Sequence, residues 1–173
     1  MKQRSNLAHK VVWITGASSG LGKALAQHCA LHGAEVILMA RRLTELEKVR
    51  QSLSDPHRHI CIAADITDEN QVRHAYEQVL AEKGRVDWLI NNAGLSQRAL
   101  IADTSMQTER AIMEVDYFSQ VFLTKTVLPL FLKQKIWPYY FCLQCCWFVG
   151  HAVPRLLFRR QSRHSYVGQQ FTR

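Results

Sequence analysis

A glycine-rich segment, TGASSGLG from Thr15 to Gly22, lies between a short apolar run and a stretch with helical periodicity. Glycines at such a junction permit a tight turn, and they let backbone N–H groups approach a phosphate closely. The start of the following helix favours the negative charge of that phosphate. The segment therefore predicts a site for the pyrophosphate of a dinucleotide. The alternative interpretation is a glycine-rich turn that binds no ligand.

Two arginines, Arg41 and Arg42, follow the second apolar run, about 20 residues after the glycines. A site for NAD places an acid at this point to hold both ribose hydroxyls, but here the position is Ala40. A guanidinium can bind a 2′-phosphate through two parallel hydrogen bonds, whereas a carboxylate would repel it. We therefore expect NADP as the cofactor, with NAD less favoured. The alternative is that both arginines are solvated charges at the start of a helix.

The segments that must position these residues alternate between apolar runs and helix-like stretches from Lys10 to Ile90. The apolar runs read KVVWIT, AEVILMA, RHICIAAD and RVDWLINNAG. Near-continuous apolar strands between helices indicate βαβ units and a parallel sheet that is buried on both faces. The predicted fold is α/β, a Rossmann-type doubly wound parallel sheet that is truncated after the fourth strand and the following long helix.

For two of the predicted helices, the sequence also predicts which residues are buried or where the helix begins and ends. In LTELEKVRQSL, we expect one buried face made of Leu43, Leu46, Val49 and Leu53. The segment from Thr104 to Lys135 reads as one long helix, capped by Thr104 and bent or ended by Pro129.

The spacing T-G-x-x-x-G-x-G resembles the cofactor loop of the classical short-chain dehydrogenase/reductase family. NNAG, from Asn91 to Gly94, resembles the second motif of that family, and AADIT resembles the segment that holds its adenine-contacting aspartate, here Asp65. The resemblance covers residues from about Lys10 to Lys135. It implies NADP-dependent interconversion of an alcohol and a carbonyl by hydride transfer. The residues implied in cofactor binding are Gly16, Ser18, Ser19, Gly20, Leu21, Gly22, Arg41, Arg42, Asp65, Ile66, Asn92, Ala93 and Gly94.

The catalytic half of the family pattern is absent. The family uses a Tyr-x-x-x-Lys pair, in which the lysine lowers the pKa of the tyrosine, and a serine about a dozen residues earlier. No lysine follows Lys135, so neither Tyr139, Tyr140 nor Tyr166 has a partner at the required spacing. Asp116 stands where family members usually carry an asparagine, and an ionised aspartate accepts hydrogen bonds but donates none. We therefore expect no complete catalytic set and an inactive chain.

The composition changes abruptly after Lys135, and we divide the chain into residues 1–135, the nucleotide-binding part, and 136–173, an aberrant and poorly structured tail. Reading the underlying codons one base later turns Trp137 and Trp147 into glycine and permits GHIIFVSSVAG, followed by YYSAAKAAIHMWANSLR. These segments are similar to the family's fifth strand, catalytic serine and Tyr-x-x-x-Lys pair. A frameshift in a run of adenines at Gln134 and Lys135 is therefore the favoured explanation. The alternatives are a non-catalytic NADP-binding or partner-binding protein with a genuine tail, and a membrane anchor formed by residues 136–158.

Composition excludes several classes of function. The net charge is +8, but residues 1–135 hold 17 basic against 14 acidic residues, so nucleic-acid binding is not favoured. A bilayer-crossing helix is also unfavoured because the tail contains prolines and arginines. Cys142, Cys145 and Cys146, with His151 and His164, lack the second pair that a zinc site needs, so no metal is expected.

Cys29 and Cys61 read as buried thiols of a reduced compartment, and no secretory signal precedes the first strand, so cytoplasmic localisation is expected. The stretch around NNAG resembles family members that act on small lipophilic alcohols or carbonyls, and a full-length form could be oligomeric.

Overall fold

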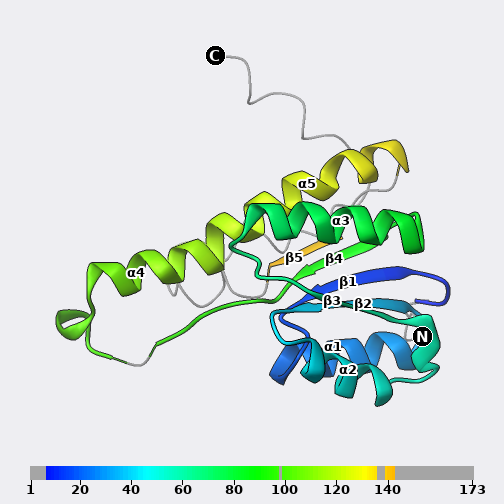
Figure 1. Ribbon diagram of the computed structural model, residues 1–173, viewed down its shortest axis with the longest axis horizontal. Coiled ribbons are helices and arrows are strands. Elements are labelled where there is room, and N and C mark those ends of the chain that lie inside the picture. Colours follow the sequence, from blue (N-terminus) through cyan, green and yellow to red (C-terminus); the bar gives the residue numbers. More distant parts are fainter. Residues whose placement is uncertain (1–6, 98, 136–138, 143–173) are drawn as a thin grey trace, which may run out of the picture.

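The computed structural model describes residues 7–97, 99–135 and 139–142. Its centre is a sheet of five parallel strands in the order β3-β2-β1-β4-β5 (Figure 1). The strands are β1 (Val11–Thr15), β2 (Glu35–Ala40), β3 (Ile60–Ala63), β4 (Trp88–Asn91) and β5 (Tyr139–Cys142). The predicted Rossmann-type doubly wound sheet is confirmed.

Strand β1 lies at the centre of the sheet, and each of its residues is buried. Val11 and Trp13 belong to the apolar cluster on one face, whereas Val12 and Ile14 belong to the cluster on the other face. This alternation is the strand period of two, and it explains why the central strands read as continuous apolar runs.

Helices cover both faces of the sheet (Figure 1). Helices α1 (Gly20–Leu31) and α2 (Leu43–Gln51) lie on one side, and α3 (Glu69–Lys83) and α5 (Ser119–Lys133) lie on the other. Asp68 caps α3 by accepting hydrogen bonds from the amides of Asn70 and Gln71, and Gly84 ends it in the left-handed conformation. Two short 3₁₀ turns, Pro56–Arg58 and Ile101–Asp103, complete the connections.

The predicted buried face of LTELEKVRQSL is correct except at its first position, although its last member, Leu53, lies beyond the end of α2 at Gln51. Leu46, Val49 and Leu53 are buried, but Leu43 is 47% exposed. Because Cα–Cβ bonds tilt toward the helix N-terminus, a side chain at the first position covers the end of the helix and not the sheet.

The predicted long helix consists of three parts. Helix α4 (Met106–Met113) runs into a π-helical turn (Glu114–Phe118), which continues as α5. Ser105, and not Thr104, is the cap: the Ser105 hydroxyl accepts from the Thr108 amide at 3.1 Å, whereas the Thr104 hydroxyl donates to Leu100 O.

Pro129 does not end α5, which continues to Lys133. A proline inside a helix removes one backbone hydrogen bond. On either side of Pro129, Val127 and Phe131 are fully buried against the sheet, and this packing holds the helix together through the proline.

The sheet also differs from the prediction at its far edge. Strand β5 pairs in parallel with β4, from Trp88↔Tyr139 to Asn91↔Cys142, so the sheet continues beyond the fourth strand. Aromatic residues favour strands, and the unpaired backbone groups of β4 offer an edge on which such a segment can pair. The remaining residues of the predicted tail, 136–138 and 143–173, lie outside the described residues.

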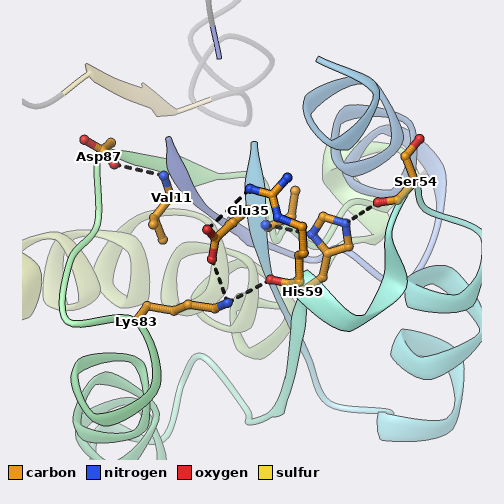
Figure 2. A network of polar contacts seen from close by, with 8 residues as sticks. Val11, Glu35, Ser54, His59, Lys83 and Asp87 are labelled. Carbon is orange, nitrogen blue, oxygen red and sulfur yellow. Dashed lines mark hydrogen bonds and ion pairs between the residues drawn. The ribbon is translucent and has the colours of Figure 1, made fainter. Parts of the chain in front are cut away.

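Polar contacts tie the amino ends of the strands together (Figure 2). The buried imidazole of His59 accepts from the amide of Val36 through Nδ1 at 3.0 Å, and its Nε2 donates to Ser54 O at 2.8 Å. Burial lowers the pKa of His59, in keeping with a neutral ring that both accepts and donates.

Two acids complete these contacts. Glu35 accepts from Lys83 Nζ at 2.8 Å, and this hydrogen bond lowers the pKa of Glu35 below its usual range. Asp87 is buried and accepts from the amide of Val11 at 2.9 Å. These contacts hold the end of the sheet opposite the candidate site.

Candidate functional site

A cavity of about 620 Å³ lies at the carboxyl ends of the strands. The chain leaves β1 toward β2 on one side, and β4 lies on the other side of β1, so the order of connection reverses at this point. Ligands of open α/β sheets bind at such a reversal, and the volume lies within the usual range for ligand sites. The cavity is lined by Thr15, Gly16, Ser18, Ser19, Leu21, Met39, Ala40, Arg41, Arg42, Ala64, Asp65, Ile66, Asn92, Ala93, Gly94, Leu95 and Val115.

The structure brings the predicted cofactor-binding residues together around this one cavity. Each of them lines it except Gly20 and Gly22. Gly20 has a φ of +53° and open space where a Cβ would lie. Gly22 instead packs inside the loop: a Cβ there would lie 2.4 Å from Gly16 O and 2.5 Å from Asn92 Nδ2.

Thr15 and Asn92 join the glycine-rich loop to the NNAG segment. The Thr15 hydroxyl accepts from the amides of Asn92, at 3.0 Å, and Ala93, at 2.9 Å. The Asn92 side-chain amide donates to Thr15 O at 2.9 Å and to Gly16 O at 3.2 Å. The two motifs are therefore one structural unit. The sequence placed both motifs after strands, but it contained no signal that they bond to each other.

The start of α1 faces the cavity with its amides uncapped. Ser19, at the N-cap position, makes no side-chain capping bond, and the first turn carries no acid. Four amides at a helix start lack partners within the helix, and the helix dipole adds positive charge there. This end of α1 is therefore suited to a phosphate group.

Arg41 and Arg42 stand at the end of β2, and both are exposed and line the cavity. Within the part of the chain that the structure describes, neither guanidinium forms a salt bridge. Both are therefore available to an anionic ligand.

Asp65 follows β3 and is held by its own loop. Its Oδ1 accepts from the amide of Thr67 at 3.0 Å and from the Thr67 hydroxyl at 2.8 Å, and its amide donates to Gln71 at 2.9 Å. These bonds orient the Asp65–Ile66 segment at the rim of the cavity.

Asp116 lies in the π-helical turn, and its Oδ1 accepts from the amide of Leu95 at 2.7 Å. Burial raises the pKa of this carboxyl, although the Leu95 amide opposes the shift. Four residues further on, buried Gln120 donates to Ala93 O at 3.0 Å. The helix thus holds the backbone of residues 93–95 in place. Sequence analysis missed Gln120, Leu95 and Val115, since no motif marks them.

The cavity lining contains no tyrosine and no lysine among the residues that the structure describes. The residues that the structure describes contain no group of three or more side chains that could bind a metal ion. Of the cysteine and histidine cluster considered for zinc, Cys145, Cys146, His151 and His164 lie outside the described residues. Burial raises the pKa of the Cys29 thiol to about 11 and that of the Cys61 thiol to about 12, so neither is a ready nucleophile or ligand. Cys29 is buried as predicted, and Cys61 is half-buried.

No helix in the described ranges is long and apolar enough to cross a bilayer. Most of the segment considered as a membrane anchor, residues 136–158, lies outside these ranges.

The fold and the paired motifs define a nucleotide-binding α/β domain, and residues 10–136 match the short chain dehydrogenase family. The chain belongs to this family.

Two similar proteins are dehydrogenase/reductase SDR family member 7 of Homo sapiens and the SDR family protein 7-like protein of Drosophila melanogaster. The human protein is 42% identical over 134 residues, which cover 75% of this chain and 40% of the relative. The fly protein is 43% identical over 138 residues, which cover 77% of this chain and 42% of the relative. The chain thus spans less than half the length of these curated relatives.

Solved structures show the same fold. A short-chain dehydrogenase from Streptomyces avermitilis superposes with a TM-score of 0.71 at 34% identity, covering 77% of this chain and 48% of that one. A 3-ketoacyl-(acyl-carrier-protein) reductase from Brucella melitensis, complexed with NADH, superposes with a TM-score of 0.70 at 32% identity. This match covers 74% of the present chain and 52% of the reductase.

Proposed function

We propose that the cavity binds NADP(H). The observation that carries this proposal is the pair Arg41 and Arg42, which form no salt bridge within the described residues and directly follow Ala40, where an NAD site would place an acid. A 2′-phosphate beside the ribose would accept hydrogen bonds from one or both arginines.

The other lining residues fit the remaining parts of the dinucleotide. The uncapped start of α1 suits the pyrophosphate, and the Asp65–Ile66 segment suits the adenine. The nicotinamide end then lies toward Asn92, Ala93 and Gly94, on the β4 side of the cavity. When bound, the dinucleotide supplies the hydride donor or acceptor for interconversion of an alcohol and a carbonyl.

Direct titration tests the cofactor preference. The fluorescence of NADPH and of NADH is followed as the protein is added to each. We expect NADPH to bind at least about tenfold more tightly, since hydrogen bonds to a charged group contribute about 1.5–3 kcal/mol. Equal affinity, or tighter binding of NADH, would overturn the preference for the phosphorylated form.

We further propose that this chain binds the cofactor without catalysing hydride transfer. The support is the lack of a lysine beyond Lys135, which leaves every later tyrosine without its partner. On this proposal, a single-base shift separates the chain from a form that carries the serine and the Tyr-x-x-x-Lys pair. That form would act, in the cytoplasm, on a small lipophilic alcohol or carbonyl. The nucleotide sequence around the codons of Gln134 and Lys135 decides the matter: without an adenine run followed by an open shifted frame, the proposal fails.

The second candidate is a non-catalytic binding protein with a genuine tail. Strand β5 favours it, because Tyr139–Cys142 continue the parallel sheet with the sequence as it stands. Recovery of the same tail from the protein itself, by mass spectrometry of the native product, would support this candidate over the frameshift.

A further inference from the structure

Asp116 is a half-buried carboxylate without a cationic partner in the described part of the chain. Its one hydrogen bond there is the 2.7 Å contact from the amide of Leu95 to Oδ1. Two other acids with reduced exposure are paired with lysines, Glu35 with Lys83 and Asp87 with Lys10. Asp65 and Asp68 instead accept hydrogen bonds from amides of their own loop and helix start. The carboxylate of Asp116 is thus a half-buried charge that no cation in the described residues neutralises.

The position of Asp116 relates this charge to the cavity. Its bonding partner Leu95 and its neighbour Val115 both line the cavity, on the side of β4. Arg41 and Arg42 line the cavity on the side of β2. Strands β2 and β4 lie on opposite sides of β1. The cavity therefore has two arginines on the side of β2, with Asp65 after β3 beyond them, and the carboxylate of Asp116 behind its wall on the side of β4.

This polarity matches one redox state of the proposed ligand better than the other. If the arginines and the start of α1 hold the phosphates, the nicotinamide ring would lie toward the β4 side. The oxidised ring carries a positive charge, whereas the reduced ring is neutral. A carboxylate near a partly desolvated ring attracts the cation and has no comparable effect on the neutral form.

We propose that Asp116 is a specificity-determining residue that makes the site favour the oxidised dinucleotide over the reduced one. The proposal rests on dinucleotide binding in this cavity, and it concerns the relative affinity of the two redox states.

The test compares the wild-type protein with the Asp116→Asn variant. The asparagine keeps an Oδ1 that can accept from the Leu95 amide, so the wall of the cavity is preserved while the charge is removed. The dissociation constants of NADP⁺ and NADPH are measured for each protein by calorimetry at low salt. We expect the preference for NADP⁺ to fall in the variant by on the order of tenfold, because the change removes the attraction of the carboxylate for the charged ring.

Glu114→Gln is the matched control. Glu114 is an exposed acid in the same π-helical turn, so this change removes one charge that water already screens. The redox preference of this control should stay close to that of the wild-type protein.

A pH series adds a readout that a merely structural role would not move. Burial raises the pKa of Asp116, and among the described residues no charged neighbour contributes to this shift. The wild-type preference for NADP⁺ should therefore decline as the pH falls toward the pKa of this carboxyl, whereas that of Asp116→Asn should not change.

The outcomes separate the two proposals. If neither protein binds either form, dinucleotide binding itself is refuted. If both bind and the ratio of affinities is the same with aspartate and asparagine, the role of Asp116 is refuted and binding stands.

Discussion

Gly22 and Asn92 lie in such close contact that a methyl group on Gly22 would come within 2.5 Å of the Asn92 side-chain nitrogen. The same nitrogen donates to Thr15 O and Gly16 O. Asn92 therefore contacts both the first helix, at Gly22, and the turn that begins the glycine-rich loop, at Thr15 and Gly16. One side chain from the second motif sets how closely this loop packs.

Replacing Gly22 with alanine should destabilise the protein and weaken dinucleotide binding together. The added methyl group would meet Gly16 O at 2.4 Å, and a backbone atom cannot move aside cheaply. Overpacking of this kind costs about 1–3 kcal/mol. Urea denaturation followed by circular dichroism measures the loss, and NADPH titration measures the binding.

The control for this change is Lys23→Ala, at an exposed position next to Gly22. It should alter the free energy of unfolding by less than about 0.5 kcal/mol. If Gly22→Ala were as stable as this control and bound NADPH normally, the packing of Gly22 against Asn92 would not matter.

The double variant Arg41→Ala/Arg42→Ala should lose affinity for NADPH by about 10- to 100-fold, because one charge-assisted hydrogen bond to the 2′-phosphate is worth about 1.5–3 kcal/mol. Affinity for NADH should hardly change, since NADH has no 2′-phosphate. Fluorescence titration with both cofactors measures the two effects. Lys48→Ala, a highly exposed charge on α2, controls for the loss of net positive charge. An equal loss for both cofactors would assign the arginines to the pyrophosphate or to general attraction.

Stability should decrease on acidification because of His59. Burial lowers the pKa of His59 in the folded chain, so the unfolded chain takes up a proton more readily. The contribution of His59 to the free energy of unfolding is therefore at its maximum above the ordinary histidine pKa of 6.5, and it decreases as the pH falls below that value. Protonation would also remove the acceptor for the amide of Val36. Urea denaturation between about pH 8 and pH 5 measures this dependence.

His59→Ala should lower stability at neutral pH by about 1–3 kcal/mol, since the Val36 amide loses its partner. It should also flatten the pH dependence. His57→Ala, at an exposed position two residues earlier, is the comparison. If the free energy of unfolding of His59→Ala depended on pH as steeply as that of the wild-type protein, the acid sensitivity would come from other groups.

Residues near one another in the sequence were predicted well. The strand runs and the turn at Thr15–Gly22 were visible because burial on both faces and backbone freedom leave local marks in composition. The helix that follows residue 104 was also visible, but its cap and its π-helical turn were not. Its boundaries depend on which hydroxyl reaches a free amide, and periodicity does not record that.

The short strand at the sheet edge was not visible in the sequence for a related reason. The aromatic run after Lys135 fits no clear period, yet Tyr139–Cys142 pair with β4. An open strand edge can accept a segment on the strength of its backbone hydrogen bonds alone, which need no particular side-chain pattern.

By itself, the sequence determined which chemical groups stand at the strand ends: glycines, two arginines and an asparagine, each next to a recognisable strand. The tertiary structure alone decided that Asn92 bonds to Thr15, 77 positions earlier, and that Asp116 bonds to the amide of Leu95, 21 positions earlier. Local signals arise from neighbours along the chain, whereas these contacts exist only once the parallel sheet and the helix have brought distant segments to the same edge.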